Sequence, residues 1–77
     1  MKMVKTKFHG PTMSNSARIS AENDEGKRIY CIYDDGLSID ENHKRTAMKL
    51  VFQMIGKETE LYKGIFNHEF YWLIKRD

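Results

Sequence analysis

Four carboxylates, Asp34, Asp35, Asp40 and Glu41, lie within eight positions around the start of the most regular helical pattern in the chain. Their oxygens could bind a hard cation, or their charges could mimic nucleic-acid phosphates and occupy a basic groove on a partner. Local roles compete with both uses, because acids in the first turn favour the positive end of a helix dipole and aspartates before a glycine are typical of turns. We treat these four residues, the acidic edge, as a candidate surface for binding a partner, and we expect no metal there.

A second candidate is a set of basic and aromatic side chains on one face of a predicted sheet. Strand alternation places Lys5, Lys7 and Arg18 on the face opposite Val4 and Ile19. The strand at 28–33 adds either Arg28, Tyr30 and Ile32 or Ile29, Cys31 and Tyr33, depending on its register. The residues that we expect to carry function on this face are Lys5, Lys7, Arg18, Tyr30, Lys63 and Tyr71.

Basic residues interleaved with aromatic rings can hold phosphates while bases stack on the rings. The same side chains could anchor a protein partner. The formal net charge of +2 argues against a dedicated nucleic-acid binder, because phosphate contacts supply most of the affinity of such proteins.

Two further residues could carry chemistry, His43 and Cys31. His43 lies on the apolar stripe of the predicted helix, where a neutral imidazole could coordinate a metal, transfer protons or bond a strand carbonyl. His9 and His68 have no ligand-like spacing relative to His43, and Cys31 has no histidine at a spacing typical of an activated nucleophile. The sequence therefore predicts a structural His43, no metal or other cofactor, and no enzymatic activity.

The segment 38–56 is predicted to form the helix that positions these groups. Ser38 and Glu41 make an S-x-x-E capping box at its start, and Gly56 is typical of the position just past a helix end. Apolar residues recur at spacings of three and four and predict a stripe that faces the core. Its members are Ile39, His43, Ala47, Leu50, Val51, Met54 and Ile55.

The rest of the chain has the alternation or the β-rich composition of short strands. The strand segments are 3–8, 17–21, 28–33, 61–66 and 70–74. Gly26 can close a hairpin turn between the second and third segments, and Asn67 to Glu69 separates the last two. The predicted order is β-β-β-α-β-β, an α+β fold in which a small antiparallel sheet of about five strands has one helix packed on one face.

Composition bounds the remaining possibilities. The 77 residues, 40% hydrophobic and 31% charged, fit a single small domain spanning 1–77. The single cysteine excludes an internal disulfide framework and favours a reducing compartment. Apolar stretches fall far short of the roughly 20 residues of a membrane span, and the N-terminus lacks the apolar region of a signal peptide. We therefore expect a cytoplasmic protein with no membrane contact.

Several motifs resemble a family of small proteins encoded by phages and mobile elements. They are K-F-x-G-P-T at 7–12, S-A-R-I-S-A at 16–21 and E-N-H at 41–43, and the resemblance runs from about residue 5 to 55 and more loosely to the last hairpin. The family has a more alanine-rich helix, whereas this chain carries Met48, Val51, Phe52 and Met54. The resemblance implies an accessory protein of phage type in the host cytoplasm, and it brings no established activity or site residues.

Two functional hypotheses follow. Because small phage proteins often bind a host defence component, the first is a non-catalytic, anti-CRISPR-like inhibitor. It would bind a host protein, such as a nucleic-acid-binding defence complex, through the acidic edge or the sheet face. The second is a small nucleic-acid-binding protein that uses the basic and aromatic face. We expect a monomer or a homodimer, since the first or last strand could extend the sheet across a two-fold axis.

Overall fold

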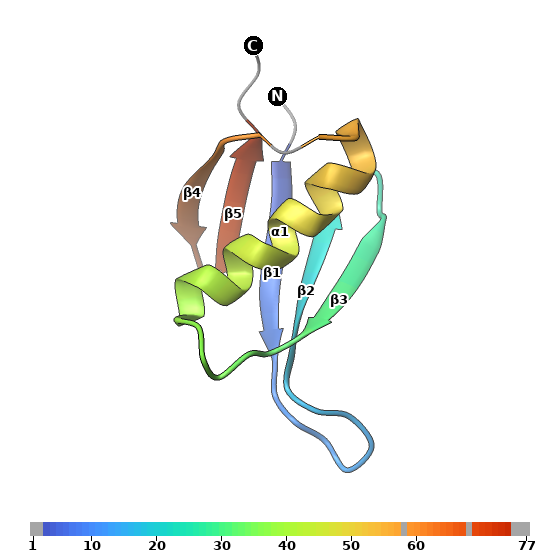
Figure 1. Ribbon diagram of the computed structural model, residues 1–77, viewed down its shortest axis with the longest axis vertical. Helices are drawn as coiled ribbons and strands as arrows, with labels where there is room; N and C mark the ends of the chain where they lie inside the picture. The colour runs from blue at the N-terminus through green and yellow to red at the C-terminus, as the bar shows by residue number, and fades with distance from the viewer. Residues whose placement is uncertain (1–2, 58, 68, 75–77) are drawn as a thin grey trace.

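The computed structural model describes residues 3–57, 59–67 and 69–74, and in these residues the chain forms one sheet and one helix. The elements in chain order are β1 (Met3–His9), β2 (Arg18–Asn23), β3 (Arg28–Ile32), α1 (Ile39–Ile55), β4 (Leu61–Phe66) and β5 (Glu69–Ile74). The strand order across the sheet is β3-β2-β1-β5-β4, and all neighbouring strands are antiparallel. α1 crosses one side of the sheet diagonally (Figure 1). The predicted α+β fold is confirmed.

β1 lies at the centre of the sheet, between β2 and β5. The expectation that the first or last strand forms an edge is therefore wrong, and the edges are β3 and β4. The reason is the path of the chain on either side of α1. The loop at 33–38 crosses from the end of β3 to the opposite side of the sheet, and α1 runs back towards β3 (Figure 1). The chain then forms β4 at the margin away from β3, and β5 lies between β4 and β1.

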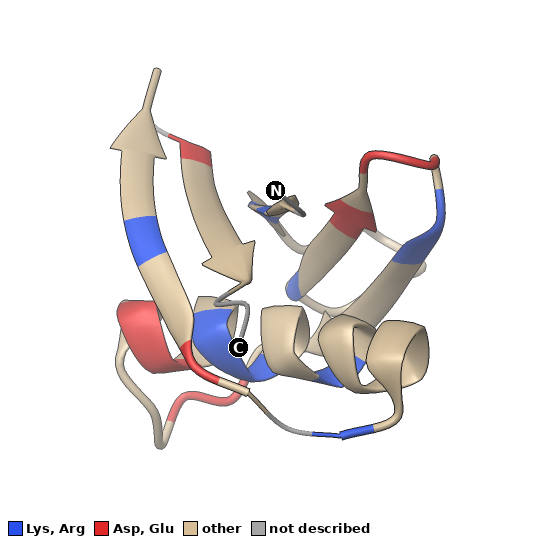
Figure 2. Cartoon of the chain, turned by 90° about the horizontal axis from the view of Figure 1, so that it is seen from above, with Lys and Arg blue, Asp and Glu red and all other residues tan. Residues whose placement is uncertain are grey.

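The pairing register assigns each strand residue to one of two faces. Ala21 of β2 is fully buried in the core beneath α1, and it pairs with Ile29 of β3. Because alternate residues of a strand share a face, Ile29 lies on the helix side, and Arg28, Tyr30 and Ile32 lie on the face that α1 leaves uncovered. We call that uncovered face the open face. Viewed from above, α1 lies to one side of all the strands (Figure 2).

The ends of α1 are capped as the sequence predicts. Ser38 precedes the first turn in an extended conformation, and its Oγ accepts a hydrogen bond from the Glu41 N–H at 3.1 Å. At the other end Gly56 has a φ of 75°, and its N–H donates to the Phe52 carbonyl at 2.8 Å. Glycine suits this left-handed position because it has no Cβ to clash with the backbone.

The core-facing stripe of α1 is only partly as predicted. Its central members are buried against the sheet, whereas Ile39 and Ile55 are 60% and 41% exposed. These two residues occupy the first and last turns, which reach the margins of the sheet (Figure 1). Asn42 and Thr46 are fully buried on the central part of the helix instead.

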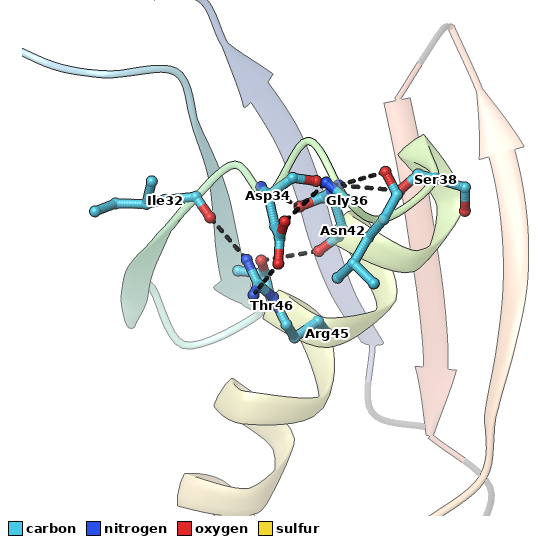
Figure 3. Close-up of polar contacts among 8 residues, drawn as sticks. Ile32, Asp34, Gly36, Ser38, Asn42, Arg45 and Thr46 are labelled. Atoms are coloured by element: carbon cyan, nitrogen blue, oxygen red, sulfur yellow. Dashed lines mark hydrogen bonds and ion pairs between the residues drawn. The ribbon is translucent and has the colours of Figure 1, made fainter.

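Asn42 fastens the loop at 33–38 to α1 (Figure 3). Its Oδ1 accepts the Asp34 N–H at 2.8 Å, and its Nδ2 donates to the carbonyl oxygens of Asp34 at 2.9 Å and Ser38 at 3.0 Å. A fully buried amide is tolerated because its donors and acceptor all have partners. One side chain therefore fixes the loop that leads into the helix, and sequence analysis gave it no such role.

We expect Asn42→Ala to lower the free energy of unfolding by about 1–3 kcal/mol, because it leaves buried backbone groups without partners. Urea unfolding monitored by circular dichroism measures this loss. Gln53→Ala, at an exposed position on α1, is the matched control and should change stability by less than about 0.5 kcal/mol. Equal losses in the two variants would show that Asn42 does not hold the loop.

Candidate functional site

The open face carries most of the predicted basic and aromatic set. Cross-strand pairing forms one row from Arg28 and Glu22 through Lys5 to Tyr71. A second row runs from Tyr30 through Ser20 to Lys7. Arg18 lies beyond these rows, opposite His9. The structure therefore places Lys5, Lys7, Arg18, Tyr30 and Tyr71 on one surface.

Lys63 was predicted on this face and lies on the opposite one. It pairs with the buried Trp72 of β5, so its side chain points to the helix side of the sheet. Its Nζ is 2.7 Å from Asp40 Oδ2 and 5.4 Å from the centre of the Phe70 ring. The register of β4 on β5 thus turns Lys63 towards the start of α1.

Charges on the open face are incompletely balanced. Arg28 forms an ion pair with Glu22 at 3.1 Å, and Lys5 forms a longer one with Glu69 at 3.8 Å. Lys7 makes no ion pair with any residue that the structure describes. Arg18 packs its guanidinium 5.2 Å from the centre of the Tyr30 ring, and its buried Nη1 has no hydrogen-bond partner within the described chain.

The pKa of His9 is affected by the positive charges of this surface. Its pKa is lowered from 6.5, first by burial and then by the charges of Arg18, Lys7 and Arg28. Its Nε2 is 2.8 Å from Ser20 Oγ. A hollow of about 110 Å³ opens here, lined by Lys5, Lys7, His9, Ser20, Glu22 and Arg28. With three cations and one carboxylate on its walls, the hollow suits an anionic group.

The acidic edge is largely used in folding. Asp34 Oδ1 accepts the Gly36 N–H at 2.8 Å, and its other oxygen lies 3.8 Å from Arg45 Nη1 (Figure 3). Asp40 pairs with Lys63, as described above, and Glu41 Oε1 accepts a hydrogen bond from the Ser38 hydroxyl at 3.1 Å. Among the described residues Asp35 has no such contact and is exposed. Asp35 is therefore the one predicted carboxylate without such a contact in the described chain, and the side chains of Asp34 and Asp40 stay 50% and 57% exposed within theirs.

A groove of about 690 Å³ opens at the far end of β1, next to the first turns of α1. Among the described residues β5 pairs with β1 only as far as Thr6, and the groove opens beside Lys7 and Phe8, which follow Thr6 on β1. Its lining residues are Lys7, Phe8, Ala17, Tyr33, Asp35, Ile39, His43, Asn67, Glu69 and Phe70. Sequence analysis did not predict this groove, because its walls come from segments far apart in the chain.

His43 lines the groove and is tied to the core by a hydrogen-bond chain. The Trp72 Nε1–H donates to Thr6 Oγ1 at 2.9 Å, and Thr6 Oγ1 is 2.7 Å from His43 Nδ1. The Thr6 hydroxyl proton has no other acceptor in the described part of the chain, so it is donated to His43 Nδ1, and the ring proton resides on Nε2. The imidazole stacks on Phe70, with ring centres 4.1 Å apart.

Burial lowers the pKa of His43 from 6.5, and the charge of Asp40 only partly opposes the shift. The ring is therefore neutral at pH 7. This is the structural role that the sequence predicted for His43, with the addition that one ring nitrogen is left facing no protein partner.

Two further observations bear on other kinds of site. No group of three or more histidine, cysteine or acidic side chains is placed to hold a metal ion in the described ranges. None of the helical segments described is long and apolar enough to cross a membrane.

We expect the free energy of unfolding to fall as the pH drops below about 6.5, because unfolding lets His43 bind a proton that the folded state disfavours. Above that pH the effect should vanish. Urea unfolding at about pH 7.5 and about pH 5.5 measures the difference. His43→Gln should reduce this difference, and His9→Gln separates the contribution of His9, whose pKa is also lowered. An unchanged pH dependence in His43→Gln would rule out this assignment.

Comparisons of the chain with protein-family models, with curated proteins and with solved structures gave no match. The resemblance to phage-encoded proteins stays a prediction from the motifs.

Proposed function

We propose that this protein binds single-stranded nucleic acid through its open face and catalyses no reaction. The observation that carries the proposal is the pair Lys7 and Arg18. Both are cationic, both lie beside aromatic or polar groups on the open face, and neither has a carboxylate partner among the described residues.

The charge distribution supports an anionic partner more strongly than the net charge does. The open face carries the cations Lys5, Lys7, Arg18 and Arg28 against the carboxylates Glu22 and Glu69. A surplus of this kind on one surface attracts phosphates even when the whole chain is close to neutral. The hollow beside His9 offers a place where a phosphate oxygen could meet several cations at once.

Tyr30 supplies a surface on which a base can stack. Its ring is 49% exposed, and Arg18 lies over it while His9 contacts it edge-on, with ring centres 5.7 Å apart. These contacts hold the ring without covering it entirely. Stacking of a base on an aromatic side chain is tolerant of sequence, because every base has a π-face. We therefore expect little base preference from this part of the surface.

Fluorescence anisotropy of labelled single-stranded DNA and RNA oligonucleotides tests the proposal. If about three phosphates are contacted, the logarithm of the affinity should fall with the logarithm of salt concentration with a slope of about −2. Absence of binding at low salt would refute the proposal.

Variants locate the contact surface. Lys7→Ala and Arg18→Ala should each weaken binding and flatten the salt slope by roughly 0.7. Tyr30→Ala should weaken binding about fivefold or more while leaving the slope nearly unchanged. Lys44→Ala removes the same charge from an exposed position on α1 and should change neither the affinity nor the salt slope. Equal losses in Lys44→Ala and Lys7→Ala would indicate a diffuse charge effect and no site on the open face.

The first hypothesis is inhibition of a host defence protein. On the acidic edge, Asp35 is the carboxylate that makes no hydrogen bond or ion pair with the described chain, so it is the residue to change when that hypothesis is tested. Asp34 is a poor test of that hypothesis, because its reversal would remove the contacts with Gly36 and Arg45 that shape the turn. Asp35→Lys is the cleaner variant.

A further inference from the structure

We propose that the groove beside His43 binds one base of the nucleic-acid strand, and that His43 Nε2 donates a hydrogen bond to an in-plane acceptor of that base. This inference rests on the proposed function for the strand itself. The base is expected to lie flat against the aromatic walls of the groove.

The unpartnered donor is the first observation behind this inference. His43 is only 4% exposed, and its Nδ1 is engaged by Thr6. Nε2 carries the proton and has no hydrogen-bond partner among the residues described. Among the described residues the one buried side-chain nitrogen or oxygen without a partner is Arg18 Nη1, so Nε2 of His43 is accessible at the wall of the groove, where a ligand or solvent can accept a hydrogen bond from it.

The shape and polarity of the walls indicate the kind of ligand. Phe70 and His43 form one stacked pair, and Phe8 and Tyr33 form an edge-to-face pair with ring centres 5.5 Å apart. Ile39 adds an apolar side chain to the lining. A volume of about 690 Å³ is within the usual range for small-ligand sites. Aromatic and aliphatic walls beside the His43 Nε2–H suit a flat heterocycle.

Charges at the rim favour a neutral base over an anionic ligand. Asp35 and Glu69 both line the groove, and Lys7 is its only lysine or arginine. A phosphate inside the groove would face two carboxylates and a neutral imidazole. The exocyclic amino groups of a base could instead donate to these carboxylates.

Lys7 connects the groove with the open face. It lines both the groove and the 110 Å³ cationic hollow. A strand that places a phosphate near Lys7 on the open face would therefore bring an adjacent nucleotide to the mouth of the groove. The two surfaces then act on successive parts of the same strand, one through its backbone and the other through a base.

Uncharged ribonucleosides test the groove separately from the cationic surface. Adenosine, guanosine, cytidine and uridine are titrated into the full-length ¹⁵N-labelled protein and followed by NMR. At least one should shift the Trp72 indole N–H and the His43 ring signals, with a dissociation constant on the order of millimolar. The imidazole ¹⁵N shifts should show the proton on Nε2 before and after binding.

Three variants keep the test independent of the fold. Ala17→Leu fills the groove from the wall that does not contain His43 and should weaken nucleoside binding at least fivefold. Ser16→Leu places the same side chain on the neighbouring, exposed position and should have no effect. His43→Gln removes the imidazole and should also weaken binding, with circular dichroism confirming that the variant is folded.

The outcomes separate the two proposals. The protein could bind oligonucleotides in a salt-dependent way, with the same affinity in Ala17→Leu, while the nucleosides shift no signals. That result would overturn the base-binding groove and leave the proposed function intact. Nucleoside binding without oligonucleotide binding would refute the proposed function and the connection through Lys7. If N-acetyltryptophanamide shifts the same signals and the nucleosides do not, the groove receives an aromatic side chain of a protein, and the inference is wrong.

Discussion

A single hydroxyl group, Thr6 Oγ1, joins the three elements on which the rest of the structure depends. It lies on the central strand β1, accepts the indole N–H of Trp72 on β5, and contacts the imidazole of His43 on α1. These partners lie 66 and 37 positions away in the sequence. Because Thr6 is fully buried, each polar atom in this chain of bonds needs its partner, and loss of one would leave the others unsatisfied in a medium of low dielectric constant.

The same strand places the two candidate surfaces. With Thr6 turned inward, Lys5 and Lys7 must point outward, so the bond that fixes α1 also fixes the cationic open face. Beyond Thr6 the pairing with β5 stops, and the groove opens at that point. The neutral form of His43 and its accessible donor depend on the residues of β1 that point inward, whereas the cations of the open face depend on the residues that point outward.

Local signals in the sequence predicted most of the fold. The capping box at Ser38, the left-handed Gly56 and the turn at Gly26, which has a φ of 86°, are all where sequence analysis placed them. Each of these three features depends on residues that are close together in the chain, so the local sequence is sufficient to predict it. The open face could also be predicted in part, because strict alternation in β1 and β2 assigns Lys5, Lys7 and Arg18 to one side whatever the pairing partner.

The remaining features depend on contacts between distant segments. Both alternating sets of β4 contain large hydrophobic side chains, Leu61 and Ile65 in one and Tyr62 and Phe66 in the other. A period of two therefore could not show which way Lys63 points, and its pairing with Trp72 determines the direction. The central place of β1 follows from the connections that lead from β3 through α1 to β4 at the opposite margin of the sheet, which no local pattern encodes. The partners of Asn42 are backbone groups of a loop, and side-chain periodicity contains no information about them.

The three residues of the E-N-H motif all serve folding and do not indicate a function. Glu41 completes the cap of α1, Asn42 holds the preceding loop, and His43 closes the buried hydrogen-bond chain. All three contribute to folding, so a relative that shares them would share the architecture and need not share a partner. Function has to be sought in groups that folding leaves unused. In the described chain these include Lys7, the Nη1 of Arg18, the carboxylate of Asp35 and the Nε2 of His43. Two of them lie on the open face, two line the groove beside it, and Lys7 belongs to both surfaces, which is why we assign both surfaces to one ligand.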